Sequence, residues 1–159
     1  MTMTLSQTIQ QQFPAELDRA VQDVFGTMLG VECSPGDAPR KTEPESFSVL
    51  IGLAGVISGS CMLRADKTSS HYIASLLTGT EGSSEAMVKD ALGEVCNMVA
   101  GTWKRSVPEL SSMCMLSPPT VISGTDYSLH SMPGEIRMQR YYSIGTTGFA
   151  VMLHCSEGQ

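Results

Sequence analysis

Four residues with chemical or steric significance recur at helical spacing in the middle of the chain. They are Asp90, Glu94, Asn97 and Gly101. Spacings of i+4, i+7 and i+11 from the first residue place all four on one narrow stripe of an α-helix. The carboxylate of Glu94 and the carboxamide of Asn97 lie three residues apart and therefore project side by side. This stripe is the strongest candidate for a functional site in the sequence.

The pairing of a carboxylate with a carboxamide restricts the chemistry that the stripe can perform. Two carboxylates would suggest acid–base catalysis of the kind used on glycosides, but an amide does not titrate at ordinary pH. Asn97 can instead hold a water molecule, because its oxygen accepts and its nitrogen donates hydrogen bonds. The neutral amide can approach a phosphoryl group without charge repulsion, while Glu94 pairs with a cation on a docking partner. Phosphoryl transfer depends mainly on alignment and charge stabilisation, so positioning a water is sufficient for hydrolysis.

The alternative interpretation is that the stripe is only the solvated side of an amphipathic helix. Three features argue against it. Gly93 and Gly101 lie inside the helix, where each costs about 1 kcal/mol relative to alanine, and the close approach of a backbone or a bulky partner would explain them. Asn97 is the single asparagine in the chain and occupies a mid-helix position that asparagine disfavours. No basic residue follows Glu94 at i+4, where a solvated helix usually carries one.

The stripe belongs to a predicted helix from Ser84 to Arg105. Ser83 or Ser84 provides the N-terminal cap, and Pro108 prevents the helix from continuing. Apolar side chains at helical spacing form a broad face opposite the stripe, which predicts that this face is buried. These apolar residues are Val88, Ala91, Leu92, Val95, Cys96, Val99 and Trp103.

Other segments predict two further helices and two blocks of strands. The first helix begins near Pro14, includes Met28 among its apolar positions, and ends at Gly30. Another helix begins after the N-cap Asp66 and stops at Gly79. The predicted strands cover residues 47–53, 60–63, 113–116, 120–122, 136–144 and 149–154, and residues 34–45 are predicted to form a loop.

The order of these segments predicts an α+β fold with a largely antiparallel β-sheet packed with long α-helices. Strands pair locally and helices are grouped between two strand blocks, whereas a parallel doubly wound sheet would need regular strand–helix alternation. The chain of 159 residues has the length of one domain. We assign residues 14–156 to this domain and residues 1–13 to an N-terminal segment, in which Leu5, Ile9 and Phe13 continue the helical spacing.

Composition narrows the classes of partner and location. The net charge is −6 and no cluster of basic residues occurs, so nucleic acid is not expected as a partner. The longest apolar run is too short to span a membrane and the N-terminus lacks the features of a signal peptide, which predicts a cytoplasmic protein. The five cysteines form no C-x-x-C pair and are expected to be small buried side chains in a reducing compartment. The three histidines are scattered, and no glycine-rich phosphate-binding or nucleotide-binding motif is present.

The stripe and its surroundings resemble the CheC, CheX and FliY family of chemotaxis phosphatases. The signature of that family is an Asp or Ser, three residues, Glu, two residues and Asn, followed downstream by a proline. This sequence has Asp90, Glu94 and Asn97 at those positions and Pro118 and Pro119 downstream. The predicted hairpin of residues 47–63 also resembles the first strand pair of the family, so the resemblance extends over most of the chain from about Pro14.

This resemblance implies an α+β fold whose long helix docks into the active site of a phosphorylated CheY-like response-regulator receiver domain. By the same resemblance, Asn97 positions the attacking water and Glu94 binds the active-site lysine of the receiver. Asp90 and Gly101 are expected to contact the partner. Mg²⁺ is expected on the receiver, so the chain needs no cofactor or metal of its own. The first helix has no second Glu-x-x-Asn motif, which makes the chain most like CheX, with one site per subunit and a homodimeric state.

Three functional hypotheses follow. The first is an aspartyl-phosphate phosphatase that acts on a receiver domain. The second is a non-catalytic module that binds a response regulator or switch protein through the same stripe without dephosphorylating it. The third is a structural protein with a solvated helix, for which substitution of Glu94 or Asn97 would change nothing.

Overall fold

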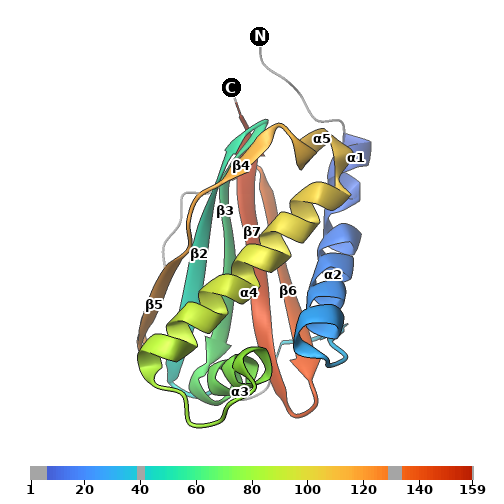
Figure 1. Cartoon of the computed structure of the whole chain (residues 1–159). Helices are drawn as coiled ribbons and strands as arrows, with labels where there is room; N and C mark the ends of the chain where they lie inside the picture. Colours follow the sequence, from blue (N-terminus) through green and yellow to red (C-terminus); the bar gives the residue numbers. More distant parts are fainter. Residues whose placement is uncertain (1–6, 39–41, 129–133, 159) are drawn as a thin grey trace.

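The chain forms one antiparallel sheet with its long helices packed against one face (Figure 1). The computed structural model describes residues 7–38, 42–128 and 134–158. The strands are β1 (Ser34–Gly36), β2 (Glu45–Gly55), β3 (Ile57–Asp66), β4 (Cys114–Leu116), β5 (Thr120–Thr125), β6 (Ile136–Ile144) and β7 (Thr147–Glu157). The helices are α1 (Gln7–Gln11), α2 (Phe13–Val24), the π-helical turn η1 (Phe25–Leu29), α3 (Lys67–Thr78), α4 (Glu85–Ser106) and α5 (Pro108–Ser111). The predicted α+β class is confirmed.

Local pairing explains most of the sheet. The strand order is β1-β6-β7-β3-β2-β4. On the same side of β2, β4 pairs with residues 53–55 and β5 pairs with residues 45–50. Hairpins join β2 to β3 and β6 to β7, and Gly145 in the second turn has a φ of 62°, which glycine adopts without strain. Because β3 pairs with both β2 and β7, the two strand blocks become one sheet.

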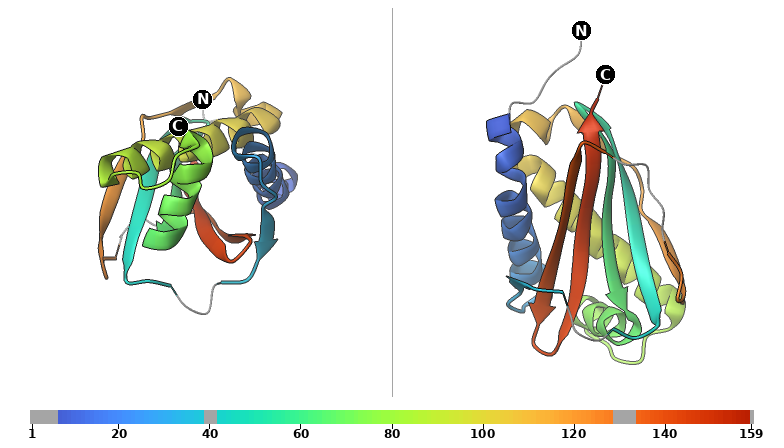
Figure 2. Two further views of the ribbon diagram at one scale, coloured as in Figure 1. Left: turned by 60° about the horizontal axis from the view of Figure 1, so that its bottom comes forward. Right: turned by 180° about the vertical axis from the view of Figure 1, so that it is seen from behind.

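The core lies between this sheet and helices α2 and α4, which cover the same face of it (Figure 2). In β2, Phe47, Val49, Ile51 and Leu53 are buried, as the period of two in the sequence predicts. Phe13 of α2 packs edge-to-face against Trp103 of α4, with ring centroids 5.2 Å apart. This contact fixes the two helices relative to each other at one end of α4.

Caps and stops in the sequence set the helix ends where they were predicted. The side chain of Asp66 accepts a hydrogen bond from the backbone nitrogen of Ser69 at 2.9 Å and so caps α3. Gly79 ends α3 in the left-handed conformation, with a φ of 74°. Gly30, with a φ of 72°, ends the helical run that α2 begins.

Two segments differ from the predictions. Leu29, and not Met28, is buried, because the last turn before Gly30 is π-helical and shifts the phase of the side chains. Residues 34–36, predicted to lie in a loop, form the edge strand β1 and pair with residues 141–143 of β6. The N-terminal segment contains α1, while Leu5 lies outside the described residues.

A polar network fastens α2 to the sheet. The carboxylate of Asp18 accepts hydrogen bonds from Arg140 Nε at 3.0 Å and from Tyr142 Oη at 2.7 Å, and it also forms an ion pair with Arg140 Nη2. Burial and the hydrogen bond to Asp18 raise the pKa of Tyr142 well above its ordinary value. The Tyr142 hydroxyl is therefore neutral and donates its hydrogen bond to Asp18.

Replacing Asp18 with alanine should lower the free energy of unfolding by about 1.5–3 kcal/mol, the usual contribution of hydrogen bonds to a charged group. Urea unfolding followed by the fluorescence of Trp103, the single tryptophan, measures this change. Asp23→Ala removes an exposed carboxylate from the same helix and should change stability by no more than about 0.5 kcal/mol. Equal losses in the two variants would contradict the role of the network.

Candidate functional site

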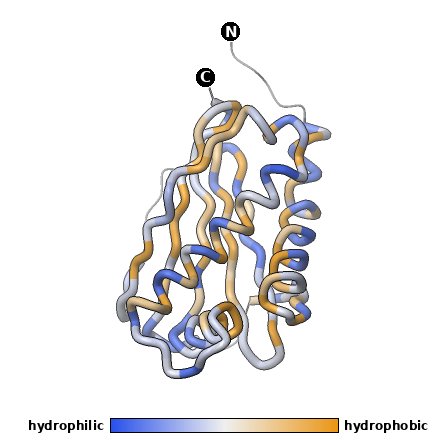
Figure 3. Tube along the Cα trace, viewed as in Figure 1, coloured by the Kyte–Doolittle hydropathy of each residue, from blue (hydrophilic) through white to orange (hydrophobic). Residues whose placement is uncertain are grey.

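Helix α4 is anchored at its first turn and along its apolar face. The side chain of Ser84 accepts a hydrogen bond from the backbone nitrogen of Met87 at 3.3 Å, which confirms the predicted cap. Glu85 accepts a hydrogen bond from Ser123 Oγ of β5 at 2.7 Å, and this bond, together with Lys89, lowers the pKa of Glu85. All residues of the predicted apolar face are buried. Figure 3 shows hydrophilic and hydrophobic segments alternating along α4, as an amphipathic helix requires.

The side chains of the predicted stripe lie on the outer side of α4. Asp90, Glu94 and Asn97 are exposed. Within the described part of the chain, no side chain forms a hydrogen bond or ion pair with any of these three. A docking partner can therefore engage them without breaking an internal contact. Since α4 is regular through this region, Glu94 and Asn97 lie side by side, with Asp90 one turn before Glu94.

Gly93 beside the stripe and Gly101 within it both face other parts of the chain. A Cβ built on Gly93 would lie 3.5 Å from Cγ of Pro119 and 3.5 Å from Cγ2 of Val121, which is ordinary van der Waals contact. Gly101 is buried beneath Arg105, whose Nη1 would lie 3.2 Å from a Cβ at that position. The partner contact predicted for Gly101 thus remains a prediction, and the exposed group at this position is the guanidinium of Arg105.

Pro118 and Pro119, the two prolines downstream of the stripe, lie in the link between β4 and β5. Ser117 holds this link against β2, because its Oγ accepts a hydrogen bond from the backbone nitrogen of Gly52 at 2.7 Å and its own nitrogen donates to the Gly52 oxygen at 2.9 Å. Pro118 and Pro119 are exposed, which suits residues without an N–H at the edge of a sheet. The contact of Pro119 with Gly93 places this link beside the stripe, one residue from Glu94.

The cysteines take no part in the exposed surface. All five are free and buried, as the sequence predicts. Cys96 precedes Asn97 but points into the core, where its hydrogen bond with Cys61 and its burial raise its pKa well above the ordinary value. The thiol is therefore neutral. Among the described residues, no group of three or more His, Cys, Asp or Glu side chains is arranged to hold a metal ion.

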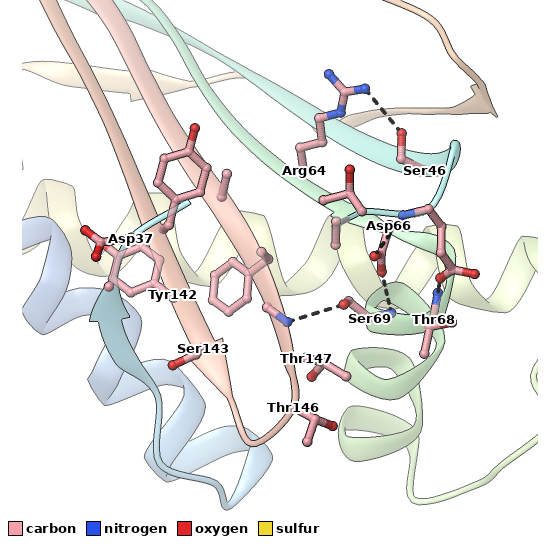
Figure 4. A pocket seen from close by; sticks show the side chains of 18 of the residues that line it. Asp37, Ser46, Arg64, Asp66, Thr68, Ser69, Tyr142, Ser143, Thr146 and Thr147 are labelled. Atoms are coloured by element: carbon pink, nitrogen blue, oxygen red, sulfur yellow. Dashed lines mark hydrogen bonds between the residues drawn. The ribbon is translucent and has the colours of Figure 1, made fainter. Parts of the chain in front are cut away.

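A cavity of about 770 Å³ lies elsewhere, between β3, the β6–β7 hairpin and the start of α3 (Figure 4). None of its described lining residues belongs to α4. Two carboxylates of its lining, Asp66 and Glu43, cap the start of α3. Asp66 accepts a hydrogen bond from the backbone nitrogen of Ser69, and Glu43 accepts one from the backbone nitrogen of Thr68 at 2.7 Å. These groups stabilise a helix end and form no constellation suited to hydrolysis.

The sequence also matches a known protein family. The family described as "Chemotaxis phosphatase CheX" matches residues 47–139, more than half of the chain, including the whole stripe. The chain belongs to the CheX family. No helix within the described residues is long and apolar enough to span a membrane.

Individual CheX proteins agree with this assignment. The chain is 27% identical over 117 residues to the CheY-P phosphatase CheX of Thermotoga maritima, covering 70% of this chain and 76% of that protein. The crystal structure of CheX from Vibrio vulnificus has a TM-score of 0.77 and 23% identity, covering 92% of this chain and 97% of that one. CheX in the CheX–CheY–BeF3–Mg²⁺ complex from Borrelia burgdorferi has a TM-score of 0.75 and 24% identity, covering 91% and 98%. These structures establish the CheX fold for this chain.

Arg105 lies on the same side of α4 as the stripe, over Gly101, and the sequence patterns did not single it out. The predicted stripe ends at Gly101. The spacing of i+4 from Gly101 to Arg105 could have indicated this position, because long side chains of a helix lie over the preceding turn.

Proposed function

We propose that this CheX-family chain is a phosphatase that hydrolyses the aspartyl phosphate of a CheY-like receiver domain. The observation that carries the proposal is the exposed pair Glu94 and Asn97 on an anchored helix, with no internal partner among the described residues. The names of two relatives support it: one is a CheY-P phosphatase, and another was crystallised with CheY, beryllofluoride and Mg²⁺.

In the proposed reaction, α4 docks into the active site of the receiver. Asn97 holds a water, accepting one of its hydrogens through the amide oxygen, and aligns it with phosphorus. The water oxygen bonds to phosphorus while the bond from phosphorus to the aspartyl oxygen breaks. The products are the free carboxylate and inorganic phosphate, which keeps one proton of the water, and the other proton goes to solvent. Glu94 pairs with the lysine of the receiver and thereby sets the position of Asn97.

The chain contributes no metal to this reaction in our proposal. Mg²⁺ is carried by the receiver and neutralises negative charge on its phosphoryl group. The active-site donors of this chain, a carboxylate and an amide three residues apart on one helix, suit contacts to a lysine and to water. The buried thiols fit a protein that works in the reducing cytoplasm.

Release of inorganic phosphate from phosphorylated receiver domains, with Mg²⁺ present, tests the proposed function. We expect the protein to accelerate release above the rate of the receiver alone. The alternative, a non-catalytic binding module, predicts a complex with the phosphorylated receiver and no acceleration. The exposure of Asn97 beside Glu94 favours the phosphatase, because binding alone does not require a water-holding amide.

We further propose that the chain forms a homodimer through the free edge of β6. Strand β1 pairs only with residues 141–143 of β6, so residues 136–140 have no neighbouring strand on that side among the described residues. A second copy can pair there and extend the sheet across a two-fold axis. Light scattering should then give a molar mass twice the 17.0 kDa of one chain, and the mass of a single chain would contradict the proposal.

A further inference from the structure

Arg105 extends the stripe of α4 by one further turn. Its side chain folds back toward the start of the helix, the direction that helical side chains favour. The guanidinium lies over Gly101, where a built Cβ would stand 3.2 Å from Nη1 and 3.9 Å from Cζ. Arg105 itself is exposed. A partner that reaches this end of the stripe therefore meets a guanidinium that lies close over Gly101.

The charges along the extended stripe are unevenly distributed. Asp90 and Glu94 make its first part negative, Asn97 is neutral, and Arg105 makes its last part positive. The side chain of Arg105 donates one hydrogen bond, from Nη2 to Thr102 Oγ1 at 3.4 Å, which is long and leads to an uncharged group. Within the described part of the chain, no carboxylate lies within ion-pair distance of this guanidinium. Its charge is available to a partner.

We propose that Arg105 determines specificity by pairing with an acidic side chain of the receiver beside its phosphorylation site. The inference rests on the proposed function. A receiver that binds Mg²⁺ gathers carboxylates around its phosphorylated aspartate, since Mg²⁺ takes oxygen ligands. Glu94 meets the cation of that site and Arg105 meets its anions. Opposite charges at two points of one helix match the receiver in one direction only, so the pair fixes how α4 docks.

The spacing along α4 separates this role from the chemistry. Asn97 and Gly101 are four residues apart, a rise of about 6 Å, and the guanidinium lies over Gly101. Arg105 is therefore outside hydrogen-bonding distance of a water held by Asn97. Its contribution belongs to recognition of the receiver, which sets KM, and not to the hydrolytic step, which sets kcat.

The test compares Arg105→Ala with Arg19→Ala, which removes the same charge from an exposed position on α2. Two quantities are measured: KM for the phosphorylated receiver and Kd for the receiver with beryllofluoride and Mg²⁺. Arg105→Ala should raise both by about two- to fivefold, the range of an exposed ion pair, and leave kcat unchanged. The difference should disappear at high salt, because ions screen exposed charges. Arg19→Ala should behave like the wild type.

Gly101→Ala provides an independent variant. The new Cβ would stand 3.2 Å from Nη1, so the guanidinium would have to shift slightly, and no backbone atom obstructs the methyl group. Because alanine is favoured over glycine inside a helix, the fold should be at least as stable as the wild type. Gly101→Ala should raise KM when it is made in the wild-type protein. The same substitution made in the Arg105→Ala variant should not raise KM further. That dependence on Arg105 distinguishes a displaced guanidinium from a direct effect of the methyl group on docking.

The outcomes separate this inference from the proposed function. Equal KM and Kd values for the wild type and Arg105→Ala would overturn the inference and leave the phosphatase proposal intact. A fall in kcat at unchanged KM would also overturn it, because it would assign Arg105 to the hydrolytic step. A wild-type protein that neither binds nor dephosphorylates a receiver would refute the proposed function itself.

Discussion

Replacing Asn97 with alanine is expected to lower kcat for hydrolysis of a phosphorylated receiver by about 100-fold or more. The amide is the only neutral water-holding group at the centre of the stripe, between two carboxylates and a guanidinium on the described surface of α4. Without it, the attacking water has no fixed position. Binding of the receiver should be retained, because Glu94 and Arg105 remain in place. Phosphate release with excess phosphorylated receiver measures the change.

The fold should not suffer from this substitution. Asn97 is exposed and has no described partner, and alanine is favoured over asparagine inside a helix by up to about 0.7 kcal/mol. The thermal midpoint should therefore stay the same or rise. Gln22→Ala, which truncates an exposed amide on α2, is the matched control and should keep full activity. Full activity in Asn97→Ala would refute the assigned role.

Glu94→Lys should reduce kcat/KM by about 100-fold, mainly through KM. The substitution places a positive charge against the lysine of the receiver, and like charges across an interface cost several kcal/mol. Glu94→Gln keeps the shape and removes the charge, so it should give a smaller loss. Kd for the receiver with beryllofluoride and Mg²⁺ measures docking without hydrolysis.

Glu32→Lys is the control for Glu94→Lys. It makes the same change of charge at an exposed position on the connection between η1 and β1, outside α4. We expect it to leave KM within about twofold of the wild type, because distant surface charges are screened at ordinary ionic strength. If the two reversals raised KM equally, the effect would reflect overall charge, and the proposed pairing of Glu94 with the lysine would be wrong.

The parts of the fold that the sequence predicted are those with local causes. Ser84 and Asp66 cap helices through bonds to residues three positions away, and Gly79 stops one through its own conformation. The buried face of α4 follows from helical periodicity alone. These features depend on neighbours in the sequence, so single-sequence patterns contain the information.

The features that were missed have distant or unusual causes. Residues 34–36 contain proline and glycine, which indicate a turn, yet they pair with residues 141–143 of β6 more than a hundred positions away. Met28 was misplaced because a π-helical turn alters the period that the prediction assumed. The position of the Arg105 guanidinium over Gly101 depends on the conformation of one side chain, which residue spacing alone does not determine.

The candidate stripe was found because it breaks the rules of an ordinary solvated helix. Asn97 lies where its propensity is poor, and Glu94 has no basic neighbour at i+4. Such local conflicts are expected where a residue serves function instead of stability. The structure adds that a Cβ on Gly93 would make only ordinary van der Waals contact with Pro119 and Val121, so packing within the chain does not require glycine there.

The most direct test of the central claim is a single-turnover experiment on one phosphorylated receiver with Mg²⁺, using saturating wild-type protein or saturating Asn97→Ala. Receiver binding and phosphate release are recorded on the same samples. Our account predicts that both proteins bind the receiver, that the wild type accelerates phosphate release, and that Asn97→Ala leaves release at the receiver's own rate. Equal acceleration by the two proteins would contradict the assignment of Asn97 as the residue that positions the water.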